Sequence, residues 1–168
     1  MNKFRTHKCD ELRKEKVGEE VILSGWINKK RDHGNLLFID LRDNYGITQC
    51  IIDKENSNFK KLEKIQLETV IKIEGKVVER SKESVNNDIE TGEIEVVIKN
   101  FQVLGECKEL PMPVFSDREY AEEIRLKYSF LDLRRKKIHE NIILRSNVIS
   151  FIRNEMNKLG FLEFQTPI

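Results

Sequence analysis

The sequence predicts a mainly β domain of five short strands that close into a small barrel, followed by a mostly helical segment. Between residues 21 and 104 apolar residues recur at every second position, as on strands with one buried face. From Ile138 onward the apolar spacing changes to about 3.5 residues, which is typical of a helix. Two of the three prolines fall between these segments, in GECKELPMPVFS, so we expect a linker at 105–116.

The first three strands are expected at 21–30, 35–42 and 47–53, with the turn DNYG between the second and the third. The alternation leaves Phe38 on the outer side of the second strand and Gln49 on the outer side of the third. Both lie near the cationic stretch KKRDHG, which is too polar for a core. The side chains assigned to the core are Val21, Leu23, Ile27, Leu37, Ile39, Leu41, Thr48, Cys50 and Ile52.

A short helix and two more strands follow. The helix is expected at 56–66, with Ser57 or Asn58 as its N-cap. The strands are expected at 70–80 and 93–99, with Arg80 and Glu95 facing outward. Three strands, a helix and two further strands form the chain order of an OB-fold, a barrel that commonly binds oligonucleotides on its second and third strands.

The second segment is predicted to be helical. A basic helical stretch precedes a long helix at about 138–158, which Gly160 ends. This helix carries two apolar stripes and therefore needs two surfaces to bury against, of which one could belong to a partner subunit. GFLEFQTPI is then expected to begin a strand, so the domain looks unfinished.

Composition excludes several classes of function. The 168 residues carry 30 Lys and Arg against 29 Asp and Glu, so any attraction for nucleic acid must come from local patches. No apolar run has the length of a membrane helix or a secretory signal. Three separated cysteines predict reduced thiols in the cytoplasm, and neither they nor the three histidines have metal-binding spacing. No catalytic motif is present.

The outer face of the barrel has the chemistry of a single-strand nucleic-acid site. An aromatic ring such as Phe38 can stack on a base, and an amide such as Gln49 can bond a base edge. The cations Lys30 and Arg31 can hold phosphates from the adjoining loop. A carboxylate such as Glu95 accepts hydrogen bonds only, which suits the exocyclic amine of cytosine.

Over its whole length the chain resembles the N-terminal part of a bacterial-type aspartyl-tRNA synthetase. The resemblance implies an anticodon-binding OB-fold over 1–104, a linker over 105–116 and, over 117–168, the N-terminal helices and first strand of a class II α+β catalytic domain. GFLEFQTPI resembles the end of the first class II motif, which builds the homodimer interface; this implies interface roles for Ile142, Ile149, Ile152 and Pro167. The resembling stretches are GWINKKRDHGNLLFIDLRDNYGITQCIID, NDIETGEIEV, LPMPVF, RLKYSFLDLRRKK and GFLEFQTPI.

The same resemblance assigns roles on the outer face. Phe38 would stack on the middle uridine of the anticodon, Gln49 would hydrogen-bond it, and Glu95 would read the cytidine at the third position. Arg31 and Arg80 would contact the anticodon backbone or bases. The implied anticodon-binding set is Asn28, Lys30, Arg31, Phe38, Gln49, Arg80 and Glu95.

Three positions bear on which tRNA is accepted. His33 occupies a loop position that this family links to rejection of the asparagine tRNA, and a histidine resembles the relaxed kind that charges both tRNA(Asp) and tRNA(Asn). Val78 and Ser84 stand where relatives can carry an arginine and an asparagine. These departures leave the reading of the first anticodon base undefined.

The resemblance implies a cytoplasmic, homodimeric parent enzyme that ligates L-aspartate to tRNA with ATP and Mg²⁺. The arginines of the second and third class II motifs are not in these 168 residues. The chain alone is therefore expected to bind tRNA without aminoacylation activity, and no catalytic residue is assigned to it. Two alternatives stay open: a stand-alone OB-fold module that binds single strands or proteins, and a fragment of a lysyl or asparaginyl synthetase.

Overall fold

The structure is a computed structural model that describes residues 3–115 and 118–167. The chain divides into two compact units, residues 1–109 and 110–168. The division lies within the stretch where the sequence predicts a linker, 105–116. Of the predicted linker and second segment, positions 116, 117 and 168 lie outside the described residues.

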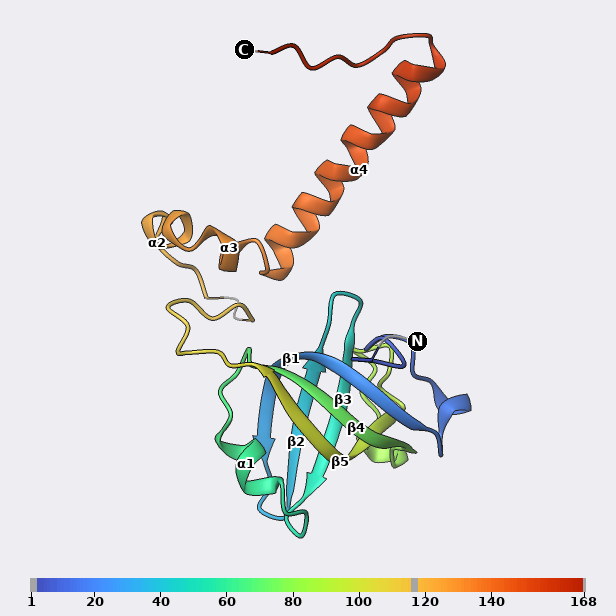
Figure 1. Cartoon of the computed structure of the whole chain (residues 1–168), viewed down its shortest axis with the longest axis vertical. Coiled ribbons are helices and arrows are strands. Elements are labelled where there is room, and N and C mark those ends of the chain that lie inside the picture. Colours follow the sequence, from blue (N-terminus) through green and yellow to red (C-terminus); the bar gives the residue numbers. More distant parts are fainter. Residues whose placement is uncertain (1–2, 116–117, 168) are drawn as a thin grey trace. The chain divides into compact units, whose positions relative to one another are not determined.

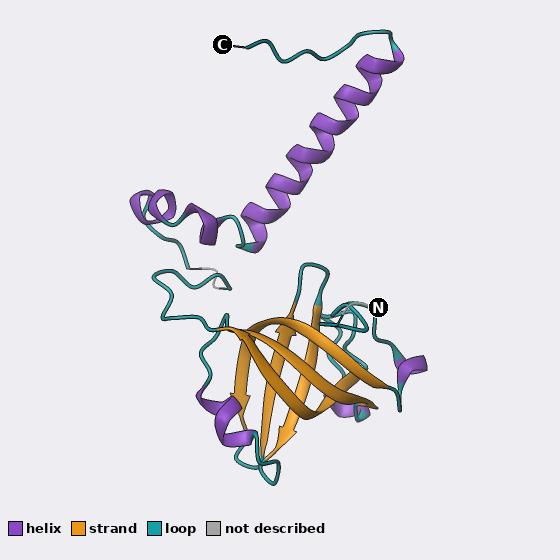
Figure 2. Cartoon of the chain, viewed as in Figure 1, coloured by secondary structure: helices purple, strands orange, loops and turns teal. Residues whose placement is uncertain are grey.

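The first unit is a closed five-stranded barrel with the strand order β1-β2-β3-β5-β4 (Figures 1 and 2). All neighbouring strands are antiparallel except β3 and β5, which run parallel. The predicted five-stranded barrel, with a helix between its third and fourth strands, is confirmed. Its elements are β1 (Glu20–Asp32), β2 (Leu36–Arg42), β3 (Ile47–Asp53), α1 (Phe59–Lys64), β4 (Val70–Glu79), the 3₁₀ turn η2 (Lys82–Ser84) and β5 (Ile94–Gly105).

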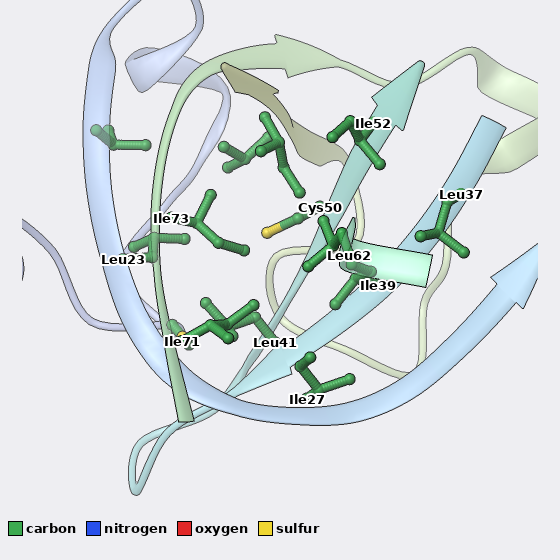
Figure 3. Close-up of a cluster of buried hydrophobic side chains, with 14 of the residues drawn as sticks. Leu23, Ile27, Leu37, Ile39, Leu41, Cys50, Ile52, Leu62, Ile71 and Ile73 are labelled. Atoms are coloured by element: carbon green, nitrogen blue, oxygen red, sulfur yellow. The ribbon is translucent and has the colours of Figure 1, made fainter. Parts of the chain in front are cut away.

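The alternating apolar residues fill the barrel interior. Every side chain of the first three strands that was assigned to the core is at most 2% exposed. Figure 3 shows Leu23, Ile39 and Cys50 pointing into the same interior as Leu62 of α1. Full burial of a leucine or isoleucine contributes about 1.5–3 kcal/mol, so this cluster is the main source of stability for the barrel.

Glycines allow the strands to approach closely where the barrel bends. A Cβ on Gly25 would lie 2.2 Å from the carbonyl oxygen of Arg42, and one on Gly75 would lie 2.4 Å from that of Val97. The β4–β5 register shifts next to Gly75, and pairing then continues to Gly105. For this reason β5 extends six residues beyond its predicted end at Lys99.

Helix α1 covers the core with Phe59 and Leu62, which are 5% and 0% exposed. It is shorter than the predicted 56–66. Asn58 holds the N-cap position, but its side chain does not cap the helix and donates to Asn100 Oδ1 at 3.4 Å. Instead, Asn56 Oδ1 accepts the Asn58 N–H at 2.9 Å and forms the turn that leads into the helix.

Residues 3–16 form an N-terminal strap that is fastened to the barrel. Its helical part is the 3₁₀ turn η1 (Lys14–Lys16). Thr6 and Ile22 exchange hydrogen bonds of 2.8 and 2.9 Å, and Cys9 and Leu12 are buried. Asp43 joins the strap to the β2–β3 turn, because its carboxylate accepts the N–H groups of Cys9, Tyr45 and Gly46.

The second unit is helical, with α2 (Glu122–Lys127), α3 (Ser129–Asp132) and α4 (Lys136–Lys158). Its small core consists of Met112, Val114 and Leu131. Helix α4 ends as predicted at Gly160, whose φ of 88° closes a C-terminal turn in which Phe161 N–H donates to Met156 O at 3.0 Å. Within the described ranges, no helix has both the length and the apolar character needed to cross a membrane.

The strand expected at GFLEFQTPI is absent from the described residues. Positions 161–167 follow α4 without regular structure. A strand requires hydrogen bonds to a neighbouring strand, and the described part of the second unit offers none. The prediction of a first catalytic-domain strand is therefore wrong for this chain as it stands.

Leu62→Ala should destabilise the barrel by about 2–5 kcal/mol, because it leaves a cavity where α1 meets the core. Urea unfolding, followed by the fluorescence of Trp26, the single tryptophan, measures this change. Lys61→Ala on the exposed side of the same helix is the matched control and should change stability by less than about 0.5 kcal/mol. Equal effects of the two substitutions would contradict the assignment of Leu62 to the core.

Candidate nucleic-acid interface

The strand register gathers the proposed binding residues on the outer side of the barrel. Arg31 of β1 lies opposite Phe38 of β2, and Asp40 of β2 lies opposite Gln49 of β3. Glu95 lies on β5, which runs beside β3. Four strands, β1, β2, β3 and β5, therefore supply one face that carries a ring, an amide and charged groups.

A β-bulge at Asn28 decides which cations reach this face. The β1–β2 register shifts between Ile27 and Lys29, which places Lys29 and Arg31 on the outer side and Lys30 on the inner side. Both Lys30 and Arg31 belong to β1, which extends to Asp32, and not to a loop as predicted.

Lys30 is not part of the binding face, which corrects its predicted role as a phosphate clamp. Its Nζ donates to the carbonyl oxygens of Glu63 and Ile65, at 2.6 and 2.5 Å, at the C-terminal end of α1. A cation is favourable there because the last carbonyls of a helix carry partial negative charge. Burial lowers the pKa of the Lys30 ammonium, as expected for a group held under a helix.

Hydrogen bonds link the polar side chains of the face in the order Asp40, Arg31, Gln49 and Glu95, and we call this series the charge chain. Arg31 Nη2 donates to Asp40 Oδ1 at 2.8 Å and to Gln49 Oε1 at 3.0 Å. Gln49 Nε2 donates to Glu95 Oε2 at 2.9 Å. The amide thus turns its oxygen to a cation and its nitrogen to a carboxylate, which fixes its orientation.

These hydrogen bonds make Gln49 less accessible than an outward strand residue usually is. Its side chain points outward, yet the residue is only 7% exposed because Arg31 and Glu95 cover it. Both ends of its amide are satisfied, so the face is stable without a ligand. A base that approaches Gln49 must replace one of these internal partners.

Arg80 is also buried, at 6% exposed, although the alternation predicts an outward position. Its Nε donates to Ile94 O and its Nη1 to Ser84 O, both at 3.1 Å, and Nε lies 3.8 Å from Glu95 Oε2. Among the described residues its buried Nη2 has no hydrogen-bond partner. Burial lowers the pKa of this guanidinium, and a buried donor without a partner is unfavourable.

Phe38 lies against His33, whose ring centroid is 5.1 Å away at an interplanar angle of 77°. This is an edge-to-face contact, a favourable geometry for two rings. A tight turn holds His33 in place: Gly34 has a φ of 80°, and its N–H donates to Asp32 Oδ1 at 2.7 Å. The residue expected to govern specificity therefore contacts the residue expected to stack.

The remaining predicted residues are not members of the charge chain. Asn28 forms the bulge, and its Oδ1 is buried without a hydrogen-bond partner in the part of the chain that the structure describes. Ser84 contributes its carbonyl to Arg80, while its hydroxyl bonds Ser81 within η2. The expected interface residues of α4 form a separate surface in the second unit, with Ile142, Ile149 and Ile152 being 38–54% exposed and Pro167 exposed beyond the helix.

Sequence reasoning missed two members of the face, Asp40 and Lys29. Asp40 anchors Arg31, and Lys29 is exposed opposite Asp40. Strict alternation along β2 already places Asp40 outward beside Phe38, so this signal was available. The position of Lys29 depends on the bulge, which no residue type in NKKRD marks.

The chain matches two family models. Residues 21–104 match the OB-fold nucleic acid binding domain, and residues 121–168 match the class II tRNA synthetases (D, K and N). Over its full length the chain is 79% identical to an aspartate–tRNA(Asp/Asn) ligase of Pelagibacter ubique and 54% identical to one of Phenylobacterium zucineum. The chain spans 28% of the length of these curated relatives.

Solved structures share the architecture. Asparaginyl-tRNA synthetase from Pyrococcus horikoshii, complexed with asparaginyl-adenylate, is similar with a TM-score of 0.81 and 26% identity, over 96% of this chain and 36% of the other. Aspartyl-tRNA synthetase from Entamoeba histolytica is similar in fold, with a TM-score of 0.84 at 19% identity, over 96% of this chain and 39% of the other.

Lys30→Ala should lower the free energy of unfolding by about 1–2 kcal/mol, because the two helix carbonyls lose charge-assisted hydrogen bonds. Lys29→Ala removes the same charge from the exposed neighbouring position and should change stability by less than about 0.5 kcal/mol. Urea unfolding monitored at Trp26 compares the two variants. If Lys29→Ala proved the more destabilising, the register that the bulge imposes would be wrong.

Proposed function

Because the chain belongs to the OB-fold nucleic acid binding domain family, we propose that its barrel binds the anticodon loop of a tRNA. We propose further that the longer protein ligates aspartate to this tRNA, as the names of its curated relatives state for them. The observation that carries the proposal is the outer face of the barrel. It holds the Phe38 ring and the Gln49 amide, and hydrogen bonds to Arg31 and Glu95 fix the orientation of this amide.

The geometry supports a distinct task for each group. Phe38 is half-buried and offers a ring for stacking on the middle base of the anticodon. Gln49 presents a donor and an acceptor that can bond the edge of the same base once an internal partner is released. Arg31 and Lys29 supply positive charge for the backbone.

Glu95 is suited to the third anticodon base. Its carboxylate only accepts hydrogen bonds, and the N4 amine of cytosine is a donor, whereas uracil presents the O4 acceptor at the equivalent position. Arg80 Nε lies 3.8 Å from Glu95 Oε2, and its unpartnered Nη2 would bond an acceptor on the same base once the groups that bury it are displaced. The pair therefore favours a base that carries both a donor and an acceptor, as cytosine does.

The second unit supports a class II parent enzyme. We propose that α4 forms a homodimer interface through the stripe that contains Ile142, Ile149 and Ile152, with Pro167 beyond it. The parent would use ATP and Mg²⁺, but the described residues do not fit a metal site, since no three of their His, Cys, Asp or Glu side chains cluster. We propose that amino-acid activation depends on the second and third class II motifs, whose arginines these 168 residues do not contain.

Phe38→Ala should weaken binding of an aspartate-type anticodon hairpin by roughly 1–3 kcal/mol, because the base loses its stacking partner. Fluorescence anisotropy with hairpins of aspartate, asparagine and lysine anticodons measures this loss and separates the related synthetases. Phe38→Tyr keeps the ring and should retain most of the affinity. Unchanged affinity of a correctly folded Phe38→Ala variant would sink the stacking assignment.

We propose that the parent also accepts tRNA(Asn). The support is the position of His33 on the edge of Phe38, together with relatives named for both tRNAs. A side chain that touches the stacking ring can alter how the neighbouring anticodon bases are seated, and hence how strongly a C is preferred over a U at the third position.

In the full-length enzyme, His33→Leu should raise the ratio of kcat/KM for tRNA(Asp) over tRNA(Asn) by a factor of about 3–10, equivalent to about 0.7–1.4 kcal/mol. Aspartylation of the two tRNAs at matched concentrations measures the ratio, and His139→Leu in the second unit is the control. A parent enzyme that charges tRNA(Asp) alone would overturn dual acceptance.

A further inference from the structure

A second cationic surface lies away from the base-reading face, where the N-terminal strap meets the β2–β3 turn. The strap, residues 3–16, contains six Lys and Arg against three Asp and Glu, whereas the whole chain has a net charge of only +1. Two exposed rings are interleaved with these cations: Phe4 is 44% and Tyr45 is 49% exposed. We call this surface, made of Lys3, Phe4, Arg5, Lys8 and Tyr45, the strap patch.

The rings hold the cations of the strap patch in place. Lys8 Nζ lies 4.1 Å from the centroid of the Tyr45 ring, and Arg5 Cζ lies 5.5 Å from it. Lys3 Nζ lies 5.0 Å from the centroid of Phe4. Because a cation over a ring loses part of its freedom before any ligand arrives, binding an anion there costs less ordering entropy than at a solvated lysine.

Nearby carboxylates reduce the charge of the patch but do not use all of its hydrogen-bond donors. Lys8 pairs with Glu11 at 3.3 Å, and Arg5 pairs with Asp43 at 3.5 Å. An ammonium has three donors and a guanidinium has five, so each keeps donors for a further acceptor. The Asp43 carboxylate also accepts hydrogen bonds from three backbone N–H groups, so Arg5 is only one of its partners.

The patch is a fixed part of the barrel. Thr6 and Cys9 hydrogen-bond the strap to the barrel, and Leu12 of the strap is fully buried. The backbone that carries the cations is therefore held against the barrel. Asp43 follows the last residue of β2 and lies five positions after Phe38, which corresponds to roughly 17 Å along a strand. A double-stranded stem carries a phosphate on each strand at every base pair, so it presents several phosphates within that distance.

We propose that the strap patch binds the phosphate backbone of the stem next to the RNA loop that the outer face reads. The inference rests on the proposed function, because it is that loop which brings a stem to this end of β2. The patch would add affinity without sequence preference, since phosphate contacts position a nucleic acid but do not read its bases.

The test uses the double variant Lys3→Gln, Lys8→Gln, and leaves Arg5 in place because Arg5 pairs with the buried Asp43. Binding is measured by fluorescence anisotropy, across a salt series, to an anticodon hairpin and to its loop strand without the stem. The control is Lys60→Gln, Lys61→Gln, which removes the same charge from the exposed side of α1. Thermal unfolding verifies that each variant is folded.

The double variant should bind the hairpin about 3- to 10-fold more weakly and lower the slope of log affinity against log salt by about 1–2. Its affinity for the loop strand should stay unchanged, and the α1 control should alter neither. An unchanged hairpin affinity and salt slope would overturn the proposal, as would an equal loss for hairpin and loop strand. Phe38→Ala run in parallel separates the two ideas, because its failure to weaken either RNA would instead refute the base-reading face.

Discussion

The binding face depends on a single extra residue in β1. Side chains of a strand alternate between two faces, so a shift of one residue exchanges inside and outside for everything that follows. The bulge at Asn28 makes this exchange. After it, Arg31 lies outside opposite Phe38, while Lys30 turns inward and fastens β1 to the end of α1. The same shift thus stabilises the barrel and supplies the cation that orients Gln49.

The charge chain of the face resolves a conflict between stability and recognition. A buried amide or guanidinium without partners is unfavourable, yet a reader of bases needs free donors and acceptors. Gln49 and Glu95 satisfy each other, and Arg31 bonds both Asp40 and Gln49. An RNA base bound at this face would therefore exchange hydrogen bonds with it more than add new ones. Such exchange would contribute modest affinity and strong discrimination, because a wrong base leaves a desolvated group unpaired.

Much of the fold and part of the face follow from alternation alone. The period of two identified the core strands and placed Phe38, Gln49 and Glu95 outside, because each strand has one face toward a single interior. The roles of Lys29 and Lys30 did not follow, since NKKRD contains no glycine or proline that marks a bulge. The burial of Gln49 and Arg80 depends on contacts with residues of other elements, which no local pattern encodes. The strand expected at GFLEFQTPI is absent for a related reason: a strand needs a neighbouring strand, and the described part of the second unit contains none.

In the two proposals together, the outer face would contact the anticodon bases and the strap patch would contact the phosphates of the stem. A chain with a net charge of +1 gains little from long-range attraction, so its affinity for RNA must come from local contacts. Base contacts differ between right and wrong anticodons, whereas phosphate contacts are common to all stems. Strengthening the patch would therefore raise affinity for every tRNA equally and leave their ratio unchanged. Under the proposed function, tRNA choice would rest on the small region around His33, Phe38, Gln49 and Glu95, where the loss of one hydrogen bond would alter discrimination without altering the barrel.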